Sequence, residues 1–70
     1  MFVYKCIFMH DNGATHDLCE EVIASPYELS KDEIKSILYQ KKVYSSNDSM
    51  ITDLGVHQIF PNIIGKPFIV

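Results

Sequence analysis

The fold of this chain is decided by the stretch from Phe2 to Ala24, FVYKCIFMHDNGATHDLCEEVIA. Two apolar runs flank the dipeptide Asn12-Gly13. This dipeptide is the strongest short-range signal for a β-hairpin, because a two-residue type I′ turn needs a positive φ at both central residues. The stretch therefore predicts two antiparallel strands joined by a tight turn.

A two-residue turn at Asn12-Gly13 would also fix the register of the hairpin. It would place Cys6 opposite Cys19 and Lys5 opposite Glu20. The first strand is apolar on both faces, which is typical of a strand in the middle of a sheet. The second strand carries acidic side chains, which are typical of an edge strand that resists unwanted pairing.

Length and composition predict one domain that spans residues 1–70. The chain has 70 residues and is 47% apolar, which is too apolar for a disordered segment. It has no run near the roughly 18 apolar residues of a membrane span. Its start lacks the charged region and cleavage site of a signal peptide, and two cysteines without such a signal are typical of a reducing cytosol. We therefore expect a cytoplasmic protein with no membrane partner and no cofactor.

The best-marked helix follows the hairpin. Ser30 is the predicted N-cap, and Glu33 three residues later completes a capping box. The pattern predicts a helix from Lys31 to about Lys41. Its narrow apolar stripe suits packing on one sheet face and consists of Ile34, Ile37 and Leu38.

The rest of the chain is marked less clearly. Val43-Tyr44 is expected to begin a short strand. The stretch from Met50 to Phe60 fits either a helix capped by Asp48 or a late strand. We favour a short helix or turn over Ser49–Leu54, followed by a strand.

The apolar tail and the hairpin complete the predicted architecture. Either Phe68 to Val70 or Ile63-Ile64 is expected to pair in the sheet, most simply beside the first strand. The fold class is therefore α+β, with an N-terminal β-hairpin, one capped helix packed on a small, mostly antiparallel sheet, and one or two C-terminal strands. One helix covers one face, yet the first strand is apolar on both. The C-terminal segment or a second copy must cover the other face, so a homodimer is expected.

The acidic residues are concentrated in one third of the chain. The net charge is −3, and seven of the nine acidic residues lie between Asp11 and Glu33. The six basic residues are all lysines, whereas arginine is the usual reader of bases and phosphates. This argues against direct nucleic-acid binding and favours a partner with a basic surface. The candidate partner-binding residues are Asp17, Glu20, Glu21, Glu28, Asp32 and Glu33.

Other interpretations of the polar residues stay open. The acidic side chains also fit a solvated edge strand and helix start. Cys6, His10, His16 and Cys19 have the residue types of a zinc site, but the predicted register puts His16 on the face opposite the cysteines. Cys6 facing Cys19 is within reach of a disulfide, whereas two buried thiols that fill space are the simpler interpretation.

The predicted function is that of a small, non-enzymatic protein-binding module. No catalytic or phosphate-binding motif is present, and 70 residues leave little room for a substrate pocket. The module would act stoichiometrically as an inhibitor or regulator of a basic, nucleic-acid-handling protein. Phage and mobile-element inhibitors share this size and acidity, which is an analogy and not a family match.

Two alternative functions remain from the sequence. The first is a metal- or redox-responsive protein that uses Cys6 and Cys19. The second is a weak nucleic-acid binder that uses lysines of the second half of the chain, Lys35, Lys41, Lys42 and Lys66.

Overall fold

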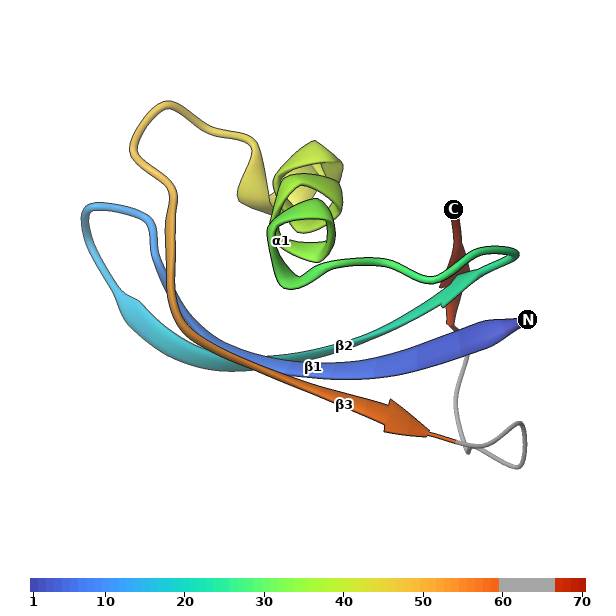
Figure 1. Cartoon of the computed structure of the whole chain (residues 1–70). Helices are drawn as coiled ribbons and strands as arrows, with labels where there is room; N and C mark the ends of the chain where they lie inside the picture. The colour runs from blue at the N-terminus through green and yellow to red at the C-terminus, as the bar shows by residue number, and fades with distance from the viewer. Residues whose placement is uncertain (60–66) are drawn as a thin grey trace.

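A computed structural model gives the structure of residues 1–59 and 67–70. The elements are β1 (Phe2–Asp11), β2 (His16–Ser25), α1 (Lys31–Gln40), the 3-10 helix η1 (Lys42–Tyr44), β3 (Met50–Ile59) and β4 (Phe68–Ile69). The strands form one sheet in the order β3-β1-β2-β4, and α1 lies on one side of it (Figure 1). The predicted α+β fold is confirmed.

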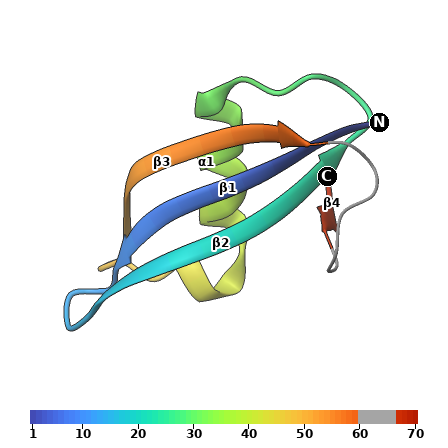
Figure 2. The ribbon, with the colours of Figure 1, turned by 90° about the horizontal axis from the view of Figure 1, so that it is seen from below.

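β1 is the central strand, as its apolar character on both faces predicts. It pairs antiparallel with β2 and with β3. Figure 2 shows β1 between these two strands, with α1 running across the far side of the sheet. Successive side chains of a strand alternate between the two faces. The even-numbered residues Tyr4, Cys6 and Phe8 are buried beneath α1, so the odd-numbered residues of β1 belong to the other face.

The predicted register of the hairpin is wrong, because the turn lies one position later in the chain than expected. Asp11 pairs with His16, so the tight turn is centred on Gly13-Ala14 instead of Asn12-Gly13. Gly13 has a φ of 90° and is the only residue of the turn with a positive φ, which matches a type II′ turn with glycine first. The Asn12 side chain favours this arrangement, because its Oδ1 accepts from the amides of Ala14 and Thr15 at 2.9 and 2.8 Å.

The shifted turn changes the cross-strand partners without changing the faces. Each residue of β1 moves by two positions relative to β2, and two positions preserve the face. Cys6 therefore lies opposite Glu21 and not Cys19, while Cys19 lies opposite Phe8. The two cysteines are free and diagonal to one another on the helix-covered face.

The predicted helix and its cap are confirmed. α1 begins after Ser30, whose side chain accepts from the Glu33 amide at 3.2 Å, while Glu33 accepts from the Ser30 amide at 3.0 Å. Its residues Ile34 and Leu38 are fully buried against the sheet. Together with the even-numbered side chains of β1 they form one hydrophobic core.

The region after α1 differs from the prediction. Val43-Tyr44 belongs to η1, and Met50–Ile59 is one continuous strand without a helical turn. A β-bulge between the pairs of Ile7 and Met9 lets the strand keep both Ile51 and Leu54 in the core. A sequence that alternates irregularly, with Gly55 in its middle, therefore still forms a strand.

The C-terminal strand pairs in the sheet, but not where it was expected. Phe68–Ile69 runs parallel to β2 at Ile23 and Ala24, because β3 occupies the place beside β1. The other predicted pairing segment, Ile63-Ile64, lies outside the described residues, as does Phe60. No helix in the described part of the chain is long and apolar enough to cross a bilayer.

Candidate functional site: the open face of the sheet

The six acidic residues predicted to bind a partner lie in two separate places. Asp17, Glu20 and Glu21 are on β2, where Asp17 lies near the hairpin turn and the two glutamates lie in the middle of the strand. Glu28, Asp32 and Glu33 are exposed around the start of α1. α1 crosses the sheet, and its first turn lies near β3, away from β2 (Figure 2). The structure therefore does not gather these six carboxylates on one surface.

Glu21 is engaged inside the molecule. Its carboxylate accepts from the Lys41 amine at 2.7 and 2.8 Å and from the Tyr44 hydroxyl at 2.8 Å. The side chain of Glu21 is only 15% exposed. Burial, and then the hydrogen bond to Glu21, raises the pKa of the Tyr44 hydroxyl. These contacts connect β2 with the end of α1, so Glu21 stabilises the fold and offers little charge to a partner.

Glu33 is also used locally. The hydrogen bond from the Ser30 amide, followed by that with the Ser30 side chain, lowers the pKa of its carboxyl. This charge completes the helix cap at the positive end of the helix dipole. The other four predicted residues, Asp17, Glu20, Glu28 and Asp32, have exposed side chains.

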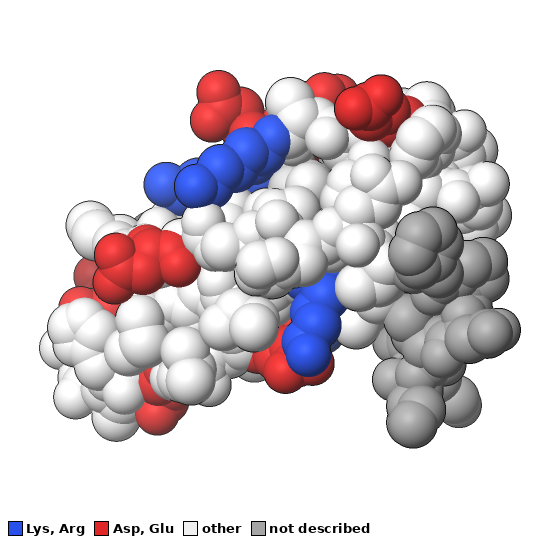
Figure 3. Space-filling view, turned by 60° about the horizontal axis from the view of Figure 1, so that its bottom comes forward, with Lys and Arg blue, Asp and Glu red and all other residues white. Residues whose placement is uncertain are grey.

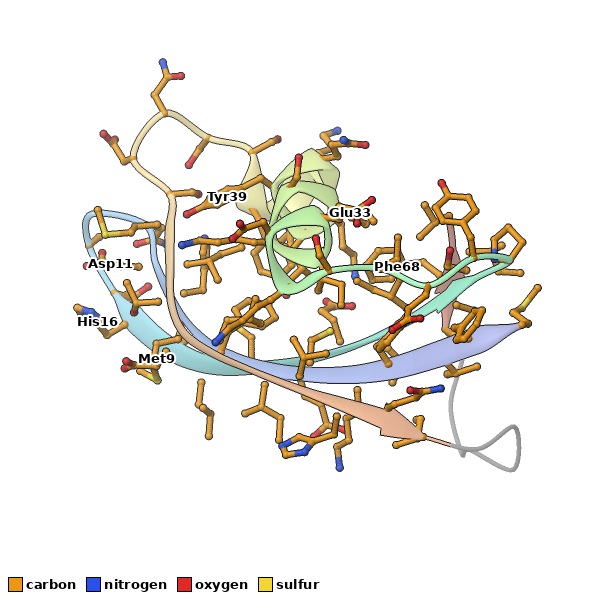
Figure 4. All side chains as sticks on the ribbon, viewed as in Figure 1. Met9, Asp11, His16, Glu33, Tyr39 and Phe68 are labelled. Carbon is orange, nitrogen blue, oxygen red and sulfur yellow. The ribbon has the colours of Figure 1, made fainter. Side chains whose placement is uncertain are left out.

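The face of the sheet opposite α1 has a different character. On β1 it presents Ile7 and Met9, both partly exposed, and on β2 it presents Leu18, which is 72% exposed, and Val22. Figure 4 shows Met9 at the sheet on the side away from α1. We call this surface the open face, and it consists of Lys5, Ile7, Met9, Leu18, Glu20 and Val22 with the neighbouring side chains of β3.

Charge on the open face is sparse and balanced. The Lys5 amine lies 3.5 Å from the Glu20 carboxylate, and both side chains are substantially exposed. Figure 3, turned so that this side comes forward, shows a broad uncharged surface with acidic and basic groups beside one another in it. A contiguous apolar surface with a polar rim is typical of a protein-interaction site.

The cysteines and histidines do not converge. Cys6 is fully buried, and His10 is bound to the Ser49 hydroxyl at 3.1 Å. His16 lies on the open-face side of the hairpin and pairs with Asp11 at 3.3 Å (Figure 4). Within residues 1–59 and 67–70, no three His, Cys, Asp or Glu side chains are placed to hold a metal ion.

The lysines expected for the nucleic-acid alternative are also divided. Lys41 is bound by Glu21 and lies 5.0 Å from the centre of the Phe68 ring. Lys35 and Lys42 are exposed on α1 and η1, and Lys66 lies outside the described residues. The described lysines therefore form no continuous basic groove.

A shallow groove lies between α1 and β4. Its volume is about 260 Å³, below the roughly 300 Å³ at which small-molecule pockets begin. Its walls are mainly apolar and are formed by Ile37, Gln40, Lys41, Phe68, Ile69 and Val70.

Comparison with known proteins adds no further constraint. No protein-family model matches the chain, and no similar curated protein or solved structure was found.

The open face was only partly visible in the sequence. The alternation of β1 indicates a strand that is apolar on both sides, and one helix covers only one of them. The sequence predicts a binding surface made of acidic residues, whereas the accessible side chains that share one face in the structure include the apolar Ile7, Met9 and Leu18. Their common face follows from the strand alternation and the register together.

Proposed function

We propose that this chain is a non-enzymatic module that binds another protein and acts stoichiometrically as an inhibitor or regulator. One observation carries the proposal: the open face presents partly exposed apolar side chains of two neighbouring strands, while α1 covers the opposite face. Covering this face with a partner removes apolar surface from water, which is the main driving force of protein association.

The charge of the module favours a basic partner. Glu20 lies on the open face and Asp17 nearby at the outer part of β2, and both are exposed. The net charge of −3 adds a long-range attraction for a positively charged protein. Proteins that handle nucleic acids have such surfaces, and small acidic inhibitors of phage or mobile-element origin offer an analogy in size and charge.

Affinity capture at two salt concentrations tests the proposal. The tagged chain would be immobilised, exposed to lysate of its host at low and moderate salt, and the retained proteins quantified by mass spectrometry. We expect one partner in stoichiometric amount whose retention falls with salt, because screening weakens attraction between exposed charges. The double variant Asp17→Asn/Glu20→Gln should weaken retention, while Glu28→Gln/Asp32→Asn, which removes two exposed charges around the distant helix start, serves as the matched control. Equal retention by both variants would contradict the electrostatic part of the proposal.

A second copy of this chain is another candidate occupant of the open face. Lys5 and Glu20 lie side by side on it, so two copies related by a two-fold axis could exchange these partners. Light scattering across a range of concentrations distinguishes the cases. A dimer would be favoured if the mass of the wild-type protein rises with concentration to twice that of one chain, while the Ile7→Thr/Met9→Gln variant keeps the mass of a monomer. If the wild-type protein keeps the mass of a monomer at every concentration, the partner of the open face is a different protein.

A further inference from the structure

We propose that the outer edge of β2 binds an extended, basic segment of a partner protein as an added strand. This goes beyond the proposed function, although it shares the premise that the partner is a protein. The open face explains which side chains a partner covers. The edge of β2 explains where the partner's backbone binds.

Within residues 1–59 and 67–70, the outer edge of β2 is unpaired along most of its length. β4 pairs with β2 only at Ile23 and Ala24. In the described part of the chain, residues 16–21 of β2 therefore pair with β1 alone. Six residues of strand span about 20 Å, enough for a partner segment of five or six residues.

Two hydrogen bonds show which backbone groups point outward. The Val70 amide donates to the Ala24 carbonyl at 2.9 Å, so the polar groups of Ala24 point away from β1. The Asn12 amide donates to the Thr15 carbonyl at 3.3 Å, so those of Thr15 point toward β1. Direction alternates along an antiparallel strand. Leu18 and Glu20 therefore present their N–H and C=O groups outward.

The other long edge is a poorer template. Asp53 in β3 has a φ of 55°, next to the bulge that interrupts pairing with β1. Bulges at an edge twist the strand and hinder the regular addition of another one. Residues 16–21 of β2 show no break in register.

Charge determines what kind of segment fits the β2 edge. A second copy docked through the same edge would bring the exposed carboxylates of Asp17 and Glu20 close to the same groups of the other copy, and like charges that face one another destabilise a strand pair. A basic residue opposite Glu20 is favourable instead. Glu20 forms an ion pair with Lys5 at 3.5 Å, and both side chains are exposed, so the pair is weak. The Glu20 carboxylate can therefore also bind a lysine of the partner.

The partner position opposite Leu18 favours an apolar residue. Leu18 is 72% exposed and shares the open face with Glu20, two residues away. A partner residue directly opposite Leu18 would pack on it and extend the apolar surface. The edge therefore favours a segment with an apolar residue and a lysine at alternate positions. Recognition of this kind combines main-chain hydrogen bonds for affinity with alternate side chains for specificity.

A symmetric peptide provides the probe. Acetyl-Lys-Thr-Ile-Thr-Lys-amide, added antiparallel to β2, places isoleucine opposite Leu18 and a lysine opposite Glu20. Its binding would be followed by NMR amide shifts and hydrogen exchange of the full chain. We expect saturable shifts and slowed exchange at the amides of Leu18 and Glu20. A peptide with glutamates in place of lysines should bind at least about tenfold more weakly.

Three controls make the test decisive. Methylation of the central isoleucine nitrogen should abolish binding, because that N–H faces β2 in the antiparallel pair with Leu18. Glu20→Lys should reverse the preference between the two peptides. Leu18→Pro removes one outward donor and should lose binding, whereas Leu18→Ala keeps the donor. If Leu18→Pro fails to fold, the methylated peptide answers the same question.

The outcomes separate this inference from the proposed function. Absence of shifts at Leu18 and Glu20 with millimolar peptide, or equal binding of the methylated peptide, would overturn strand addition. Ile7 and Met9 lie directly opposite Glu20 and Leu18, but the Ile7→Thr/Met9→Gln variant leaves the outward backbone groups and the side chains of β2 unchanged, so it should retain the peptide response. Loss of partner capture in that variant tests the open face and is independent of the peptide result.

Discussion

The carboxylate of Glu21 accepts two hydrogen bonds from the Lys41 amine, at 2.7 and 2.8 Å, although the residues belong to different elements. Glu21 lies on the helix-covered face of β2, and Lys41 is the C-cap of α1. Tyr44 donates to the same carboxylate. This arrangement holds the end of the helix on one side of the sheet, opposite the open face.

Removal of the Glu21 carboxylate is expected to destabilise the fold. Glu21→Gln leaves the partly exposed Lys41 amine without its anion, which should lower the free energy of unfolding by about 1–2 kcal/mol. Glu20→Gln is the matched control, because its ion pair at 3.5 Å is exposed and should contribute less than about 0.5 kcal/mol. Urea denaturation of both variants measures the difference. Equal losses would show that Glu21 and Lys41 contribute no more than a surface pair.

The cap of α1 makes a separate prediction. Ser30→Ala removes the acceptor of the Glu33 amide and should lower the free energy of unfolding by about 1 kcal/mol. Ser36→Ala, at an exposed position of the same helix, should be neutral or slightly stabilising. Thermal unfolding of the two variants compares them directly. A loss at Ser36 as large as that at Ser30 would contradict the role of the cap.

The bulge in β3 contains the one non-glycine residue of the described chain with a positive φ. Asp53 has a φ of 55°, where residues with a Cβ are disfavoured and glycine is not. Asp53→Gly should therefore raise the free energy of unfolding by up to about 1 kcal/mol, and Asp53→Val should lower it. Chemical denaturation measures both. Destabilisation by glycine equal to that by valine would show that the side chain matters more than the backbone conformation.

The two cysteines should react differently. Burial, followed by the neighbouring Glu21 charge, raises the pKa of the Cys6 thiol from 9.0 to about 11, while Cys19 is partly exposed. Two pKa units reduce the thiolate fraction near pH 8 about a hundredfold, and the thiolate is the reactive form. A thiol reagent should label Cys19 quickly and Cys6 only slowly, with the rate at Cys6 rising as the pH approaches 11. Equal rates in the folded protein would contradict the buried position of Cys6.

Local signals in the sequence predicted the elements that local interactions specify. The capping box at Ser30 and Glu33 involves residues three apart, so α1 was predicted to within one residue at its end. The apolar faces of β1 likewise identified the central strand. The turn was misplaced because Asn12 uses its side chain to bind the turn amides, an alternative that the Asn-Gly signal does not exclude.

Elements that depend on distant partners were not predictable in the same way. β3 contains Gly55 and a bulge at Asp53, and it forms a strand because it pairs with β1 along nearly its whole length. β4 lies beside β2 because β3 already occupies the position next to β1. The acidic candidate residues were separated for the same reason: Glu21 finds Lys41 across 20 positions of sequence, which no local pattern reveals.

The most direct test of the account is partner capture with the open face altered. Ile7→Thr/Met9→Gln places polar side chains of similar size on the central strand of that face, and Val43→Thr alters an exposed apolar residue of η1 as the matched control. Host lysate would be passed over each immobilised protein after circular dichroism confirms that it is folded. We predict that the partner retained by the wild-type chain is kept by the control and lost by the double variant. Equal retention by all three proteins, or no retained partner with the wild-type chain, would contradict a binding function for the open face.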